Sequence, residues 1–224
     1  MPIGFWSNSV GNRSFYGTFD GQGHSISNLT IDAKDNVSCG GLFGLGQESA
    51  MIKNLILKDC TFTAPYSCGG VIGEWYGAME NCATINVTVE GSPAMGLVGY
   101  GGIVKNCYTT NADAYREGTE AVNLYGAHDI LEDEYASGKL CYLLNQGLEA
   151  PVWFQTLGVD PYPVLDATHG TVVMNEDGTF GNWDAIESIA EKKVTGTTFN
   201  LMGQKVQKAS NGIYIIDGRK VFVK

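Results

Sequence analysis

The sequence is poor in basic residues, with 14 Lys and Arg against 24 Asp and Glu and a formal net charge of −10. Nucleic acids and anionic membrane surfaces attract proteins through patches of Lys and Arg. An acidic chain therefore argues against nucleic acid and against anionic lipid as partners. The sequence also has no apolar run near the roughly 18 residues that a transmembrane helix needs, so we expect no membrane insertion.

A secretory signal is missing as well. The N-terminus, Met-Pro-Ile-Gly-Phe-Trp, has neither the basic region nor the apolar core of a signal peptide. Either the protein is cytosolic, or a signal and earlier repeats lie outside this chain. We prefer the second alternative, because the repeats described below begin in mid-pattern near Phe5.

Signatures of metal and nucleotide sites are also lacking. The six cysteines form no Cys-x-x-Cys pair, and His128 and His169 stand alone in the sequence. No phosphate-binding glycine motif follows a predicted strand. We therefore expect no metal and no cofactor. The cysteines could form disulfides between neighbouring repeats or remain buried thiols, and we prefer thiols because Leu fills the position of Cys82 and Cys107 in other repeats.

What the sequence does contain is a repeat. Four similar phrases are centred on asparagines that are 26, 27 and 25 residues apart, namely Asn28, Asn54, Asn81 and Asn106. Between them a Gly-apolar-apolar-Gly phrase recurs, at residues 41–44, 70–73 and 96–99. A constant period of this length is typical of a solenoid, in which each repeat covers the apolar face of the one before.

The repeats have the composition of strands. They are rich in Val, Ile, Thr and Phe, and no amphipathic helix is visible between residues 15 and 112. Leu55 and Leu57 share one face of a strand, whereas Ile52 breaks the alternation, which predicts a bend at Asn54. We predict a parallel β-helix of about four coils, each of about 26 residues. The four asparagines would then form a hydrogen-bonded ladder that supports the fold.

Aromatic residues follow two of the glycine phrases. Trp75 and Tyr76 come after one, and Tyr100 comes after the next. Stacked along one corner, they could hold sugar rings or a protein partner. The alternative is that they pack at the sheet edge. We name Trp75, Tyr76 and Tyr100 as candidate binding residues.

The repeat phrases resemble a known family. The stretch 15–31, which begins Phe-Tyr-Gly-Thr-Phe-Asp-Gly-Gln-Gly-His, is followed by Gly41-Leu-Phe-Gly44 and Ile52-Lys-Asn-Leu55. These sequence motifs are similar to the GLUG-motif repeats of large bacterial surface or secreted proteins, and the similarity covers residues 1–112. The resemblance implies a right-handed β-helix with a role in surface attachment or display. It implies no catalytic residues.

The period ends after Asn111, and other elements follow. Residues 130–146 predict one helix with acidic residues at its N-terminus, which we expect to cap the unpaired strands at the end of the coils. Asp217-Gly218 between two alternating runs predicts a β-hairpin. The predicted organisation is thus repeats over 1–114, a cap over 115–170, a linker over 171–192 and a small antiparallel β module over 193–224.

The C-terminal segment carries a second resemblance. The phrases Asn200-Leu-Met-Gly-Gln-Lys-Val206 and Gly212-Ile-Tyr-Ile-Ile216 are similar to the sorting domains of type IX secretion cargo in Bacteroidota. The similarity spans residues 186–224, which is shorter than a full sorting domain. Both resemblances imply an extracellular or cell-surface location.

Enzymatic function is the alternative that the fold class raises. A β-helix is also the fold of polysaccharide lyases and glycoside hydrolases, which need two or three carboxylates on one face. The acids of the repeats share no common position, and Glu80 aligns instead with Ser27, Lys53 and Lys105. Asp20 and His24 flank two glycines, and we interpret them as partners in a capped turn.

The sequence therefore predicts a non-enzymatic surface or secreted repeat protein. Its role would be adhesion or the binding of host or dietary glycans or surface proteins, or it would serve as a stalk that displays such a function. A dimer through the exposed edge of the first coil is possible beside a monomer. The alternatives are a fragment of a larger polypeptide whose active module lies upstream, and a β-helix lyase or hydrolase.

Overall fold

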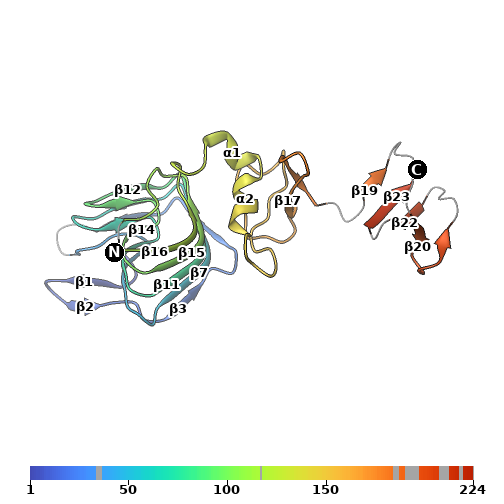
Figure 1. Ribbon diagram of the computed structural model, residues 1–224. Helices are drawn as coiled ribbons and strands as arrows, with labels where there is room; N and C mark the ends of the chain where they lie inside the picture. The colour runs from blue at the N-terminus through green and yellow to red at the C-terminus, as the bar shows by residue number, and fades with distance from the viewer. Residues whose placement is uncertain are drawn as a thin grey trace. The chain divides into compact units, whose positions relative to one another are not determined.

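The protein divides into two compact units, Met1–Asn182 and Trp183–Lys224. The computed structural model describes residues 1–33, 37–116, 118–183, 187–189, 197–206, 212–216 and 219–223. The first unit contains a β-solenoid of about 3 turns with parallel sheets (Figure 1). This confirms the predicted mainly β class. The turns are fewer than the four expected because the fourth repeat adds only an isolated bridge, Val98–Tyr115, to the sheet that holds the glycine phrases.

Stacked parallel strands form the walls of the solenoid. The long sheet contains β3 (Thr18–Asp20), β4 (Ser25–Ser27), β7 (Met51–Lys58), β11 (Ala78–Ile85), β15 (Ile103–Thr109) and β16 (Glu120–Tyr125). The second sheet contains β5 (Thr30–Asp32), β8 (Thr61–Thr63) and β12 (Thr88–Glu90), and the third contains β6 (Phe43–Gly46), β10 (Ile72–Trp75) and β14 (Val98–Tyr100). Two short strands pair beside them, β9 (Cys68–Gly69) and β13 (Ala94–Met95), and the N-terminus forms an antiparallel hairpin of β1 (Phe5–Ser7) and β2 (Gly11–Arg13).

Like positions of successive coils stack in the core. Leu55 lies opposite Cys82, and Cys107 lies opposite Leu124, so the position after the asparagine points inward in every long strand. All six cysteines are buried and carry free thiols. The preference for thiols over disulfides is therefore confirmed, and Cys serves as a small core residue where other coils use Leu.

The asparagines bend the long strands, but only three of the four share one corner. Asn54, Asn81 and Asn106 have φ angles of 55°, 52° and 52°, a left-handed conformation that Asn tolerates better than most residues. Asn81 Nδ2 donates to Asn54 Oδ1 at 3.1 Å. The predicted place of Asn28 in this ladder is wrong: Ser27 pairs with Lys58, which sets Asn28 one corner further along the coil.

The ladder also has ends and a gap that the sequence did not indicate. Asn54 Nδ2 donates to Asp20 Oδ1 at 3.0 Å, so Asp20 takes the place in the first coil that Asn28 was expected to fill. Asn123 continues the row with a 3.1 Å bond to Asn106 Oδ1. Between Asn81 and Asn106 the row is broken, because the buried Asn81 Oδ1 has no hydrogen-bond partner.

Residues 126–182, which we call the flanking segment, pack beside the long sheet. They contain α1 (Glu132–Ala136), α2 (Lys139–Leu144), β17 (Val172–Met174) and β18 (Phe180–Asn182). Their apolar side chains form a second core with Ile56, Ala83 and Tyr108, which alternate with the inward residues of the long strands and so face outward. The expectation of a cap on the coil end is thus corrected: the helices cover the side of the sheet (Figure 1).

Several details of the flanking segment differ from prediction. The single expected helix is two short ones, because Gly138 interrupts them at a φ of 90°. The expected linker over 171–192 includes the β17–β18 hairpin, whose Val172 and Phe180 belong to the second core. Trp153 Nε1 donates to the Asn106 carbonyl at 3.0 Å, and Tyr108 Oη donates to the Pro163 carbonyl at 2.8 Å. These bonds tie the segment to the coils.

The second unit is a small, mostly antiparallel sheet, as predicted. Its order is β19 (Glu187–Ile189), β23 (Arg219–Val223), β22 (Gly212–Ile216), β20 (Thr198–Asn200) and β21 (Lys205–Val206). β22 and β23 pair as a hairpin with Ile216 opposite Arg219. The predicted turn residues, Asp217 and Gly218, lie outside the described residues. Within the described part of the chain, no helix is long and apolar enough to cross a membrane.

Candidate functional site

The asparagine bend divides the outer face of the long sheet into a covered and an exposed half. After the bend, Ile56, Ala83 and Tyr108 are buried under the flanking segment. Before the bend, two rows of outward side chains run along the stack. One row is Met51, Ala78, Ile103 and Glu120, and the other is Asp20, Lys53, Glu80, Lys105 and Val122.

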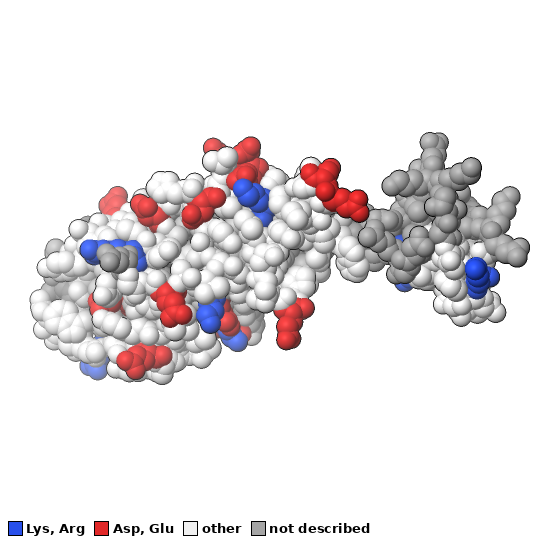
Figure 2. Space-filling model, viewed as in Figure 1, with Lys and Arg blue, Asp and Glu red and all other residues white. Residues whose placement is uncertain are grey.

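Charges alternate along the second row. Lys53 lies opposite Asp20 on one side and opposite Glu80 on the other, and Lys105 follows Glu80. Lys53 Nζ is 3.5 Å from Asp20 Oδ2. The predicted alignment of Glu80 with Lys53 and Lys105 is confirmed. The predicted alignment of Ser27 with them is wrong, because Ser27 pairs with Lys58 and Asp20 holds its expected place. Figure 2 shows acidic and basic side chains close together on this face. The two acids and two bases leave the row without net charge.

Trp75 does not belong to any surface. It is fully buried in the solenoid core. Its ring occupies space left by glycines of the two adjacent coils, since a Cβ added at Gly46 or at Gly102 would overlap the indole. Trp75 is therefore a core residue, and the prediction that it contacts a ligand is wrong. The chain bends between Ile72 and Trp75, so both face inward although Glu74 between them faces outward.

Tyr76 and Tyr100 are exposed, with 47% and 43% of their surface accessible. Tyr100 lies opposite Glu74, one coil away, and is thus diagonal to Tyr76. The Tyr76 hydroxyl donates to Glu74 Oε1, and this bond to a carboxylate raises the pKa of Tyr76 to about 12. The Cys39 thiol donates to the other oxygen of Glu74 at 3.3 Å. Glu74 is therefore held at both oxygens, and it fixes the Tyr76 ring.

Tyr16 is a third exposed tyrosine at the corner between the third sheet and the long sheet. Sequence reasoning missed it. It is 58% exposed. Phe15 pairs with Gly46, which in turn pairs with Trp75, so Tyr16 and Tyr76 hold the same position two coils apart. A signal was available, because Phe15-Tyr16-Gly17 and Trp75-Tyr76-Gly77 repeat the order aromatic, tyrosine, glycine. The inner aromatic packs in the core and the tyrosine faces solvent.

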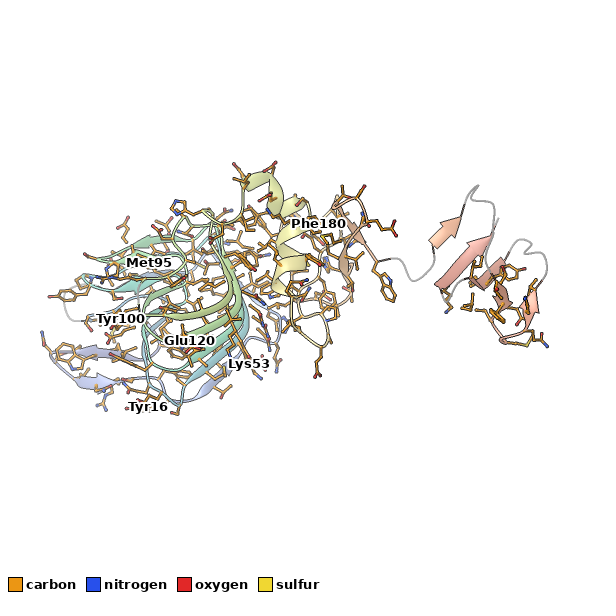
Figure 3. The ribbon with its side chains drawn as sticks, viewed as in Figure 1. Tyr16, Lys53, Met95, Tyr100, Glu120 and Phe180 are labelled. Atoms are coloured by element: carbon orange, nitrogen blue, oxygen red, sulfur yellow. The ribbon has the colours of Figure 1, made fainter. Side chains whose placement is uncertain are left out.

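We call the surface made by these side chains the exposed strip. Its members are Tyr16, Asp20, Met51, Lys53, Glu74, Tyr76, Ala78, Glu80, Tyr100, Ile103 and Lys105. Figure 3 labels Tyr16, Tyr100 and Lys53 on the solenoid, away from the helices of the flanking segment. The strip runs along the stack from the coil of β3 to the coil of β15, at a spacing of about 4.8 Å between neighbouring strands.

The other candidate residues have structural partners. Asp20 Oδ1 accepts from the Gln22 N–H at 2.9 Å, which confirms the capped turn, but its side-chain partner is Asn54 and His24 is exposed. His169 Nδ1 lies 2.6 Å from Asp160 Oδ2, which also accepts from the Thr156 N–H. This pair closes a loop of the flanking segment. Among the described residues, no three His, Cys, Asp or Glu side chains group in a way that could hold a metal ion.

Comparison with known proteins gives one partial relative. No protein family model matches the chain, and no solved structure matches it. A segment of 88 residues, 39% of this chain, is 32% identical to part of halomucin from Haloquadratum walsbyi. The chain spans only 1% of the length of that protein. The similarity thus concerns a short stretch of a very long polypeptide.

Proposed function

We propose that this chain is a non-catalytic module of a secreted or cell-surface repeat protein, and that its exposed strip binds an extracellular glycan or surface protein. One observation carries the proposal. The flanking segment buries half of the outer face of the long sheet, while the corner that borders the other half presents three tyrosines to solvent. Large apolar side chains that remain exposed together are a common property of binding surfaces.

The surface setting has independent support. A segment of this chain is similar to part of halomucin, a protein whose name describes it as a mucin. The phrases that resemble GLUG repeats and type IX sorting domains favour the same location. We also propose that the second unit, Trp183–Lys224, acts as a sorting domain for secretion.

The charge pattern favours binding over catalysis. A glycosidase needs two carboxylates on either side of the scissile bond. On the exposed strip, Glu80 stands between Lys53 and Lys105, and Glu74 is engaged by a phenol and a thiol. A lyase or hydrolase therefore remains the less favoured alternative. A fragment of a longer polypeptide with its active module elsewhere is the other, and it is compatible with a binding role for this part.

A binding screen with matched variants tests the proposal. The wild type is applied to an array of glycans and to a panel of extracellular proteins, beside a Tyr76→Ala/Tyr100→Ala double variant. Tyr66→Ala is the control, because Tyr66 is 65% exposed but lies between β8 and β9, away from the strip. We expect a ligand that binds the wild type and the control and fails to bind the double variant, with unchanged melting temperatures. Binding that survives the double variant, or no binding at all, would contradict the proposal.

A further inference from the structure

The exposed strip has the shape and chemistry to accept a polymer rather than a compact ligand. Its tyrosines recur along the stacking axis, with Tyr16 and Tyr76 two coils apart and Tyr100 one coil beyond Tyr76. The coil spacing of about 4.8 Å is close to the length of one pyranose unit in an extended chain. A chain laid along the axis would therefore meet a tyrosine at the first, third and fourth of four consecutive coils.

The tyrosine rings are available for stacking. Tyr16 and Tyr100 contact no other aromatic ring, and their hydroxyls make no hydrogen bond, within the part of the chain that the structure describes. Gly118 lies beside the Tyr100 ring, since a Cβ added there would be 3.4 Å from it. Tyr76 is held through the bond of its hydroxyl to Glu74. A ring held in place before binding loses little conformational freedom when a sugar stacks on it.

The charged row beside the tyrosines indicates an uncharged chain. Asp20 and Glu80 offer acceptors, while Lys53 and Lys105 offer donors, in alternation at the coil spacing. Sugar hydroxyls both donate and accept, so they can use each of these groups. A polyanion would meet Asp20, Glu74 and Glu80 beside each lysine, on a chain whose net charge is −10. Like charges placed together in this way are unfavourable.

We propose that the exposed strip binds an extended, β-linked, uncharged polysaccharide laid along the stacking axis of the coils. This inference rests on the proposed function and names the ligand class for the same surface. Tyr16, Tyr76 and Tyr100 stack on the apolar faces of the sugars that lie at their coils, and the row from Asp20 to Lys105 bonds to the hydroxyls on one side of the chain.

Calorimetric titration of the full chain tests the inference. The probes are β-linked gluco-, manno- and xylo-oligosaccharides of increasing length, with heparin as the polyanion. We expect affinity for at least one neutral series to rise with chain length and then level off once the strip is spanned. Tyr100→Ala should weaken binding roughly 2- to 12-fold, the effect of one aromatic contact. Tyr100→Phe, which keeps the ring, and Tyr66→Ala should bind as the wild type does.

The possible failures are distinguishable. If a surface protein binds with the same dependence on Tyr76 and Tyr100 while no neutral glycan does, this inference is wrong and the proposed function stands. If heparin binds and the neutral series do not, the strip does not prefer an uncharged chain, and this inference is wrong. If no ligand depends on the two tyrosines, both proposals fail. Circular dichroism melting of each variant separates loss of contact from loss of fold.

Discussion

Replacement of Gly46 by Ala is the perturbation that most sharply tests the placement of Trp75. Gly46 lies opposite Trp75 in the adjacent coil, and an added Cβ would overlap the indole ring. Both residues are buried, and their strands pair with each other. The Trp75 ring also lies against Gly102 of the next coil, so it has little free space to move into. One methyl group should therefore disturb the stacking of β6 on β10.

The expected cost follows from overpacking. Insertion of a carbon atom into a filled core costs typically about 1–3 kcal/mol of unfolding free energy. For a unit of this size each kcal/mol shifts the melting temperature by about 2–4 °C, so Gly46→Ala should melt about 2–12 °C below the wild type. Gly17→Ala is the matched control, because its Cβ would lie an ordinary 3.6 Å from the Phe15 ring.

A double-mutant cycle identifies the clashing partner. Trp75→Leu alone removes core volume and destabilises the protein. Combined with Gly46→Ala, it removes the overlap, so the pair should cost less than the sum of the single variants, by about 1 kcal/mol or more. Urea unfolding followed by far-UV circular dichroism measures all four proteins. Additive effects, or a Gly46→Ala variant as stable as the wild type, would show that Trp75 does not occupy this space.

Four further predictions concern the asparagine corner, the flanking segment and the cysteines. Asn54→Ala should cost about 1–3 kcal/mol of unfolding free energy, because it breaks two side-chain bonds of the ladder; Asn28→Ala, at an exposed position outside the ladder, should cost less in the same urea titration. The pKa of Asp20 is lowered by an N–H of its own turn and by the Asn54 amide, so its stabilising effect is present above its ordinary pKa and lost as pH falls through the lowered value; Asp20→Asn should therefore lose less stability than the wild type between pH 7 and pH 3. Tyr108→Phe should cost about 1 kcal/mol through loss of its bond to the flanking segment, measured by thermal melting; an unchanged midpoint would count against that bond. Burial raises the pKa of Cys39 to about 12, and since all six cysteines are buried a thiol reagent should label none rapidly in native protein and six in denaturant.

The repeat period was enough to predict the solenoid, because equivalent residues of successive repeats stack on one another. The position of Leu55, Cys82 and Cys107 after the asparagine predicted their inward direction correctly. Asn28 was misplaced because the first repeat differs internally. Its bend is made by the turn after Asp20, and the next strand begins only at Ser25. A spacing of 26 residues between Asn28 and Asn54 then coincided with the period without marking the same corner.

The errors at the candidate site have a common physical cause. Whether Trp75 faces inward depends on space provided by Gly46 and Gly102, which belong to other coils. This space depends on tertiary packing, and the alternation of polar and apolar residues within one strand does not predict it. The flanking segment was misplaced for a related reason: Ile56 and Tyr108 are apolar at outward positions, and this was the signal that something covers the side of the sheet.

The most direct test of the account is radical footprinting of the tyrosines with and without a neutral, extended β-linked glycan. All four tyrosines concerned are exposed in the free protein, namely Tyr16, Tyr66, Tyr76 and Tyr100. Mass spectrometry reports the oxidation of each in one sample, so Tyr66 serves as an internal control. We expect the glycan to protect Tyr16, Tyr76 and Tyr100 from oxidation and to leave the oxidation of Tyr66 unchanged. If the glycan changes the oxidation of none of the four tyrosines, or protects Tyr66 alone, the proposed binding surface is wrong.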